Sequence, residues 1–328
     1  MRNVIILLIL IPFFLSCERD NGSVNVVPLS VEAGISIQSA TKAIISGTSF
    51  PDNSKIGVQV LRASDGEVYE PGALTNVEFT YNEASSTWTS AKFSLTSTLG
   101  NVYAYYPFLH IGLDNEVFTN VNISINSISD FDSDIDYMFA IPLTDPSEQV
   151  SNASGKNLAN LVMQHALTQI SFVVYKENYL GTGSFTRFCI EDAGATEWVK
   201  VSKAADDDLL MNIQNGSITG GIKGAIIRNF VTPVTLSSDP PSEILQTLRS
   251  QVNASAILMP TGLIEAGDIK FTFTVDGKIC SAVNSSSITW EAGKQYIYKV
   301  KFSGTDISIS SVTVTDWDTQ LADDIIIN

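Results

Sequence analysis

Residues 270–275 read KFTFTV and lead directly into Asp276 and Gly277. Successive side chains of an extended strand point to opposite faces, so this alternation places three apolar residues on one face and the polar residues on the other. An Asp-Gly pair after such a run is typical of a tight hairpin turn. The stretch therefore predicts a β-strand of a hairpin with one face in a hydrophobic core.

The same period of two recurs along the chain. Runs rich in Ile, Val, Thr, Phe and Tyr are separated by Gly, Asn, Asp and Pro, and only residues 242–251 resemble a helix. Further alternating runs are residues 55–60, 77–81, 121–125 and 296–300. Such runs place apolar side chains on one face, as the strands of a β-sandwich do. The sequence therefore predicts an all-β fold.

The length of 328 residues allows two ordinary domains. A polar stretch rich in Ser, Asn and Pro at residues 144–157 is the predicted boundary. The apolar run at residues 158–163 either closes the first domain or opens the second. We place an N-terminal domain at residues 43–157 and a C-terminal domain at residues 158–328.

The charge balance excludes two classes of partner. The formal net charge is -16 and the sequence pI is about 4.4. Binding to nucleic acid needs clustered Lys and Arg against the phosphates, so we predict no nucleic-acid partner. Anionic lipid headgroups are disfavoured for the same reason. Contact with a membrane is therefore expected only through a covalent lipid.

The first residues have the pattern of a lipoprotein export signal. A basic n-region precedes a dozen largely apolar residues, too few to span a bilayer, and the run ends at Ser16 and Cys17. We predict a signal peptide at residues 1–16, lipidation of Cys17 and an N-terminal propeptide at residues 17–42. An ordinary secretory signal with an incidental Cys and a transmembrane anchor are the alternatives.

Catalytic motifs are missing from the sequence. It has no GxSxG, HExxH or Walker loop, and its two histidines, His110 and His165, lack the setting of a catalytic base. We predict that the protein is not an enzyme and holds no cofactor. Calcium is the alternative, because four carboxylates alternate in one run. However, the residues where an EF-hand needs Gly and Glu are both Ile. The four carboxylates are Asp130, Asp132, Asp134 and Asp136.

Two further groups of residues leave alternatives open. Cys189 and Cys280 either form a disulfide in an oxidising compartment or remain buried thiols. The aromatic residues either pack in the core or form platforms for stacking sugars. The aromatic residues concerned are Trp88, Trp198, Trp290, Trp317, Tyr103, Tyr105 and Tyr106.

The apolar C-terminus is the other unusual feature. Val312 and Val314 alternate with Thr, and Ile325, Ile326 and Ile327 follow one another close to the last residue. Exposed Ile costs about 1.5–3 kcal/mol per side chain relative to burial, so these residues are expected to be covered. They form either the last core strand of the C-terminal domain or a strand donated to a neighbouring subunit.

Together these stretches resemble the fimbrillins, which are pilus subunits of anaerobic Gram-negative bacteria. The matching elements stand in the family's order, although none is specific alone. They are the lipoprotein signal, Thr41-Lys42-Ala43, KIGV at 55–58, VEFTYN at 77–82, VYAYYP at 102–107, DYMFA at 136–140, HALTQISF at 165–172, LMP at 258–260, WEAGKQYIY at 290–298 and VTDW at 314–317.

The resemblance implies two tandem transthyretin-like or immunoglobulin-like β-sandwich domains and assembly by strand exchange. It implies that a trypsin-like surface protease cuts between Lys42 and Ala43, although Arg is commoner there. A leading strand at residues 26–37 then leaves its groove, and a neighbour's strand replaces it. Residues 312–328 are the candidate donor strand.

The implied partners are other pilus subunits, the protease and a host or bacterial surface receptor. The implied location is the outer membrane for the lipid-anchored precursor and an extracellular fimbria after processing. The alternative function is a surface-anchored, glycan-binding lipoprotein that does not polymerise.

Overall fold

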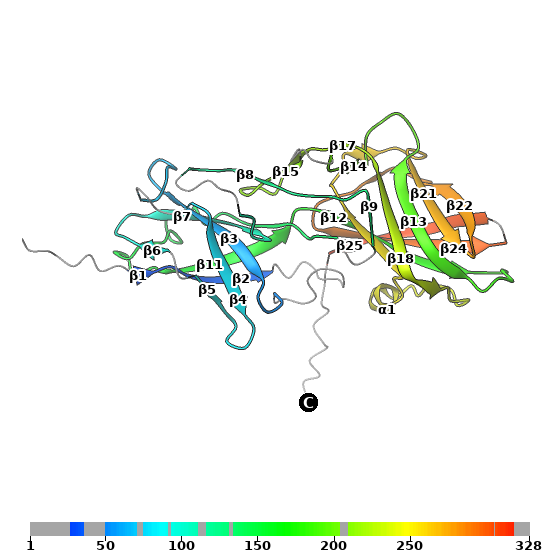
Figure 1. Ribbon diagram of the computed structural model, residues 1–328, viewed down its shortest axis with the longest axis horizontal. Helices are drawn as coiled ribbons and strands as arrows, with labels where there is room; N and C mark the ends of the chain where they lie inside the picture. Colours follow the sequence, from blue (N-terminus) through cyan, green and yellow to red (C-terminus); the bar gives the residue numbers. More distant parts are fainter. Residues whose placement is uncertain are drawn as a thin grey trace, which may run out of the picture.

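The computed structural model describes residues 27–35, 50–70, 75–90, 93–110, 116–130, 134–203, 209–304 and 306–317. Within these ranges the predicted all-β fold is confirmed, because the strands are accompanied by a single short helix, α1 (Leu245–Ser250). That helix lies inside the stretch expected to be helical. Within these ranges no helix is long and apolar enough to cross a membrane. Figure 1 shows two β-units side by side along the long axis of the molecule.

The N-terminal unit is a closed barrel whose seven strands surround one core. In order around the barrel they are β10 (Met138–Ala140), β11 (Leu158–His165), β2 (Ser30–Ile35), β5 (Thr87–Thr89), β4 (Val77–Asn82), β3 (Lys55–Arg62) and β7 (Gly100–Tyr106). A two-stranded sheet of β1 (Val27–Pro28) and β6 (Ser94–Leu95) extends it. The alternation expected for residues 77–81 appears as buried Val77, Phe79 and Tyr81. In β3, by contrast, residues 56–61 are buried on both faces, including the polar Gln59, so the solvent-facing side expected for residues 55–60 is absent there.

The C-terminal unit is a sandwich of a four-stranded and a five-stranded sheet, as the resemblance implied for this half. The smaller sheet has the order β19 (Ala254–Leu258), β12 (Thr168–Lys176), β24 (Lys294–Ser303), β25 (Asp306–Asp316). The larger has the order β22 (Lys278–Val283), β21 (Ile269–Val275), β13 (Ser184–Asp192), β18 (Ala225–Thr235), β9 (Ile128–Asp130). The stretch KFTFTV lies in β21, and its Phe271, Phe273 and Val275 are fully buried.

Three small sheets lie beside the sandwich. They are β14 (Lys200–Val201) with β17 (Ile222–Lys223), β16 (Ile218–Gly220) with β15 (Leu209–Asn212) and β8 (Asn120–Asn122), and β20 (Leu263–Ile264) with β23 (Ile288–Thr289). Figure 1 shows β8 and β15 running along the upper side of the molecule, between the barrel and the sandwich. β8 and β9 come from the first half of the chain but pair with strands of the second, so this segment joins sheets of the C-terminal half.

The boundary between the units differs from the expected one at residues 157 and 158. β11 follows the polar stretch, yet it pairs with β10 and β2 of the barrel, and its Ala159, Leu161 and Met163 are buried in the barrel core. The four-stranded sheet of the sandwich begins only at β12, after His165, whereas β9 of the five-stranded sheet comes from the chain between β7 and β10. The polar stretch is thus a loop of the barrel, and its Val150 belongs to the barrel core.

Tyr105 lies where the two units meet. Its ring is buried and packs edge to face against Phe118, which belongs to the core cluster of the sandwich. The hydroxyl donates to Asn76 Oδ1 at 2.9 Å and to the Leu109 carbonyl at 3.0 Å. A side chain on Gly57 would collide with this ring, because an added Cβ would lie 2.2 Å from Tyr105 Cε1. Glycine is therefore required at that position of β3.

The buried Tyr105 predicts a loss of stability at alkaline pH. Burial raises the pKa of its phenol to about 12, against about 10 in an unfolded chain. The folded state therefore favours the neutral phenol, and the contribution is complete below pH 10 and lost as the pH rises towards 12. We expect Tyr105→Phe to remove about 2 kcal/mol of the fall in unfolding free energy between pH 9 and pH 12. Urea denaturation at both pH values measures this, and equal falls for both proteins would contradict it.

Candidate functional site

The strand that begins the described chain, formed by β1 and β2, completes the N-terminal barrel. β2 lies between β11, to which it is parallel over six register pairs, and β5, with which Val31 pairs at Trp88. Leu29 and Val31 are 4% and 3% exposed and belong to the barrel core. Because its side chains alternate, the strand fills the barrel with one face and presents the other to solvent.

Hydrogen bonds hold this leading strand on both sides. The Ser30 amide donates to the Asn157 carbonyl at 2.7 Å, and the Leu29 amide donates to the Phe93 carbonyl at 3.3 Å. The Trp88 indole donates to the Ala33 carbonyl at 3.2 Å. Removal of the strand would open a groove with two unpaired strand edges and an apolar floor. Such a groove can accept another extended strand of alternating apolar side chains.

The chain leaves the described part of the sandwich at Trp317, next to the barrel. Trp317 is 1% exposed, and its ring stacks on that of His165 with centroids 4.3 Å apart and planes 10° apart. The His165 Nδ1 lies 2.8 Å from a carboxylate oxygen of Asp136, and both side chains are buried. The His165 imidazole is therefore enclosed between a tryptophan ring and a carboxylate.

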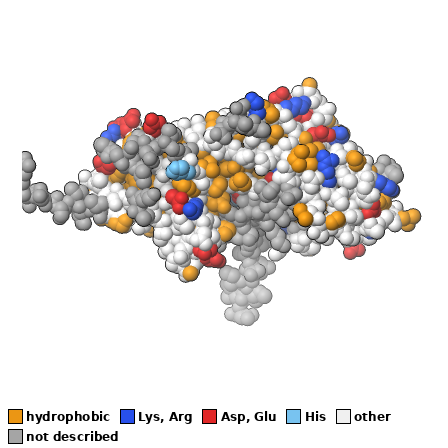
Figure 2. Space-filling model, in the orientation of Figure 1, with side chains coloured by type: hydrophobic (Ala, Val, Ile, Leu, Met, Phe, Trp, Pro, Cys, Tyr) orange, Lys and Arg blue, Asp and Glu red, His pale blue; other side chains and the backbone are white. Residues whose placement is uncertain are grey.

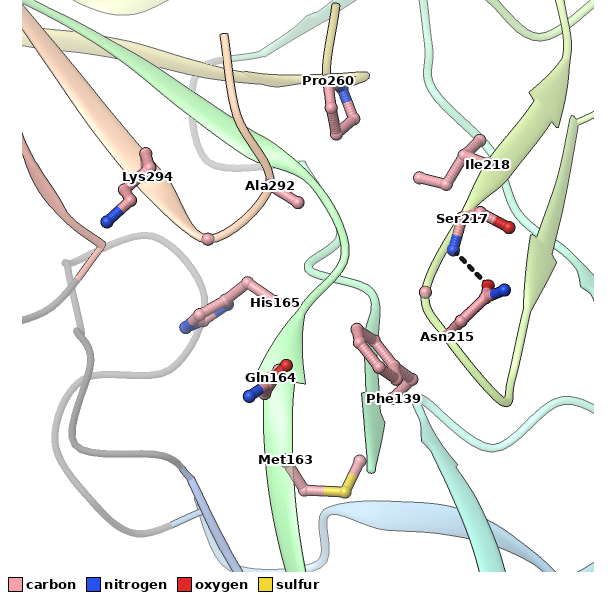
Figure 3. Close-up of a pocket in the computed structure, with 12 residues that line it drawn as sticks. Phe139, Met163, Gln164, His165, Asn215, Ser217, Ile218, Pro260, Ala292 and Lys294 are labelled. Carbon is pink, nitrogen blue, oxygen red and sulfur yellow. Dashed lines mark hydrogen bonds between the residues drawn. The ribbon is translucent and has the colours of Figure 1, made fainter. Parts of the chain in front are cut away.

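A pocket of about 400 Å³ lies beside this contact, lined from both units. Figure 3 shows Phe139 of β10 between Gln164 of β11 and the turn that carries Asn215. Within that turn the Ser217 amide donates to Asn215 Oδ1 at 2.9 Å. The turn passes so close to Phe139 that only glycine fits at residue 216, where an added Cβ would lie 2.1 Å from the ring. The pocket thus combines apolar surface with neutral amide groups and with the side chains of His165 and Lys294.

The carboxylates of the possible calcium loop point to different partners. The Asp134 carboxylate accepts from Arg228 Nη2 at 2.5 Å and from the Ile257 amide at 3.1 Å, whereas Asp136 contacts His165. Asp130 ends β9, and Asp132 lies outside the described residues. Across the described ranges no three His, Cys, Asp or Glu side chains gather as a metal site. Asp134 and Asp136 cannot converge on one cation in this arrangement.

The two cysteines of the sandwich are too far apart for a disulfide. Cys189 on β13 pairs with Thr272, and Cys280 on β22 pairs with Phe273, so β21 separates them. Strands that are not adjacent lie about 10 Å apart, beyond the reach of a disulfide. Adjacent residues of β21 also face opposite ways, and the two thiols therefore lie on opposite faces. Both side chains are buried, and burial raises the pKa of the Cys189 thiol to about 11.

Most of the candidate sugar platforms are core residues. Trp88, Trp290 and Trp317 are at most 6% exposed, and Tyr105 is fully buried. Trp198 is partly exposed, but its indole donates to Asp268 at 3.2 Å. On the face shown in Figure 2, Lys and Arg lie scattered among Asp and Glu, with apolar side chains between them. The tryptophans thus serve packing rather than a stacking surface.

The expected donor residues fall into two groups. Val312 and Val314 lie in β25, paired with Tyr298 and Tyr296 of β24, and Val314 is half exposed. Ile325, Ile326 and Ile327 lie outside the described residues. The same holds for Cys17 and for the expected cut between Lys42 and Ala43. No signal in the sequence indicated the contact of His165 with Asp136 and Trp317, although all three residues stand in stretches quoted for the resemblance.

These features define a class: two-unit all-β proteins whose N-terminal barrel is completed by the strand at the start of the chain. The sequence pattern of the fimbrillin-like family matches residues 41–317. The chain therefore belongs to the fimbrillin-like family, as the resemblance predicted. No curated protein is similar enough to count as a match.

Solved structures share the fold at low sequence identity. A fimbrial protein from Bacteroides vulgatus has a TM-score of 0.54 at 13% identity, covering 89% of this chain and 99% of that one. A candidate cell adhesion protein from Bacteroides ovatus has 0.59 at 14% identity, covering 89% and 98%. A similar protein from Bacteroides uniformis has 0.53 at 18% identity, covering 88% and 98%. At these identities the likeness establishes the fold.

Proposed function

We propose that this chain is a structural subunit of a cell-surface fimbria, assembled by strand exchange after proteolysis, and that the fimbria mediates adhesion. The observation that carries the proposal is the leading strand in the barrel. Its Leu29 and Val31 fill part of the barrel core, and without them that core would be open. Burial of two such side chains is worth about 1.5–3 kcal/mol each. A subunit without its own strand would therefore bind a neighbour's strand.

The precursor reaches the surface as a lipoprotein in this proposal. Lipid on Cys17 anchors it in the outer membrane, and a trypsin-like surface protease then cuts between Lys42 and Ala43. The cut breaks the peptide bond that joins the leading strand to the rest of the barrel, so the strand can leave the groove together with the lipidated Cys17. Membership of the fimbrillin-like family supports this order of events.

The donor segment lies within the C-terminal stretch at residues 312–328. Its apolar residues, including Ile325, Ile326 and Ile327, would replace Leu29 and Val31 in the groove of the next subunit. Backbone ladders on both sides of the groove would provide affinity, and the alternating side chains would provide register.

Controlled processing of the chain spanning residues 18–328 tests the proposal. Treatment with a trypsin-like protease is expected to give polymers visible by electron microscopy and a new N-terminus at Ala43. Lys42→Ala is expected to block both, whereas Arg62→Ala, which changes another basic residue, is not. Deletion of residues 318–328 is expected to allow cleavage but prevent polymers. A cut chain that has lost its leading strand and yet stays monomeric would refute strand exchange.

The glycan-binding alternative has less support, because three of its four candidate tryptophans are buried. Trp198 remains its best residue. Loss of glycan binding on Trp198→Ala, together with an absence of surface polymer and a lipidated Cys17 in cells, would favour that function over assembly.

A further inference from the structure

The last three described residues of the chain are held by an unusual number of specific contacts. The Trp317 amide donates to the Gly293 carbonyl at 2.9 Å, and the Asp316 carboxylate pairs with the Lys294 ammonium. Arg249 Nη2 donates to the Asp316 carbonyl at 2.7 Å and to Thr315 Oγ1 at 2.9 Å. The end of β25 is therefore fixed to α1 and to the turn before β24, beyond its ordinary pairing with β24.

The same end is also fixed to the other unit. Trp317 directly follows β25 of the sandwich, whereas His165, on which its ring stacks, ends β11 of the barrel. Asp136, from the segment before β10, holds the imidazole from its edge at 2.8 Å. Both His165 and Asp136 are buried, so neither ring nor carboxylate can turn away without opening the junction. The chain thus continues towards residue 318 from a point defined by both units.

We propose that Trp317, His165 and Asp136 are positioning residues for strand donation: they fix the point and direction from which residues 318–328 leave the subunit. This rests on the proposed strand exchange. β25 stays paired with β24 over ten register pairs, so the transferable segment starts after Trp317 rather than at Val312. When the start of this segment is held in place before association, less conformational entropy is lost as the segment enters a groove.

The pocket beside the contact of Trp317 with His165 shares residues with that contact. Gly293 and Lys294 line that pocket; the Gly293 carbonyl accepts from the Trp317 amide, and the Lys294 ammonium pairs with Asp316. Figure 3 shows Lys294 and His165 on the same side of the pocket. Only the donor end of the subunit depends on this cluster, because β2 pairs with β11 at residues 158–163 and not at His165.

This asymmetry between donor and acceptor allows a direct test. The donor is an uncut chain, with its groove occupied and its C-terminus intact. The acceptor is a cut chain whose leading strand has been removed and which lacks residues 318–328. Formation of the donor–acceptor pair is followed by size-exclusion chromatography over time. Trp317→Ala in the donor is expected to slow pair formation about ten-fold, an effect typical of losing prior order in one or two side chains.

The controls separate positioning from stability. Trp317→Ala in the acceptor is expected to have no effect, and Trp317→Phe in the donor is expected to restore most of the rate. Trp198→Ala, which removes a tryptophan elsewhere in the sandwich, is expected to leave donation unchanged. An equal loss in donor and acceptor arms, or no loss in the donor, would overturn the proposal.

A second measurement distinguishes failure of the proposed positioning role from failure of strand exchange. If unchanged donor and acceptor do not associate, the proposed function fails. The positioning role of Trp317 is then tested with a fluorophore attached to Gln320→Cys, in a chain that starts after Cys17. The remaining Cys189 and Cys280 are buried and react slowly. Trp317→Ala is expected to lower the anisotropy of this fluorophore, and an unchanged anisotropy would overturn the positioning role.

Discussion

Val31→Asp is expected to destabilise the N-terminal barrel by at least about 3 kcal/mol. The side chain of Val31 is 3% exposed in the barrel core, next to Trp88. The change removes an apolar side chain worth about 1.5–3 kcal/mol and adds the cost of placing a carboxylate among apolar groups. The chain can avoid this cost only by expelling the leading strand. Urea denaturation followed by tryptophan fluorescence measures the loss.

Glu32→Asp is the matched control, because it introduces the same residue one position further along the same strand. Glu32 is exposed, so its substitution is expected to change the unfolding free energy by less than about 0.5 kcal/mol. If Val31→Asp and Glu32→Asp have equal effects, the leading strand does not lie in the barrel as described. If Val31→Asp releases the leading strand even in the uncut chain, the groove opens. Limited proteolysis would then detect greater exposure of β5 and β11.

Arg228→Ala is expected to cost about 3–5 kcal/mol, the range found when one partner of a buried ion pair is removed. Arg228 is fully buried and its guanidinium holds Asp134 through Nε and Nη2. It also donates to the Asn126 and Ile227 carbonyls. The pair fastens the segment that comes from the barrel onto β18 of the sandwich. Thermal and urea unfolding both report the change.

The cost of Arg228→Ala is expected to depend on pH. Burial raises the pKa of the Asp134 carboxyl, and Arg228 opposes that rise. Without Arg228 the folded state favours the protonated acid more strongly, so the variant gains relative stability as the pH falls and loses it as the pH rises. The deficit should therefore be smaller at pH 5 than at pH 7.

Lys301→Ala is the control for ion pairs in general, because the pair of Lys301 with Glu177 is partly exposed. Its loss is expected to cost under about 1 kcal/mol. The double change of Arg228→Met with Asp134→Leu is expected to recover part of the stability, since no charge then remains buried. If Arg228→Ala costs no more than Lys301→Ala, the pair does not fasten the two units.

Local alternation identified the strands well, because each strand exposes one face to the core. Residues 270–275 and 77–81 show this, and in both the predicted inward side chains are buried. Alternation carries no information on which strands are neighbours. The sequence therefore did not reveal that β11 closes the barrel after a polar loop, or that β9 pairs with β18 almost 100 residues later.

The candidate site was predictable only where it depends on one strand. The leading strand at residues 26–37 was expected to occupy a groove, and the structure places its Leu29 and Val31 in the barrel core. Its parallel pairing with β11 is a long-range property that no local pattern encodes. The same is true of buried pairs: Arg228 with Asp134 and His165 with Asp136 join residues far apart in sequence, and each residue alone reads as an ordinary surface charge.

The parallel pairing of β2 with β11 also has a mechanical consequence. The ladder bonds run sideways from the strand along its whole length. A strand that linked two subunits in this position would be pulled along its own axis by the chain attached to it. All ladder bonds would then share the load at once, whereas a sideways pull would break them one after another. The groove is therefore oriented so that a bound strand resists a pull along its own axis. A sideways pull that peels the strand from one end would release it more easily.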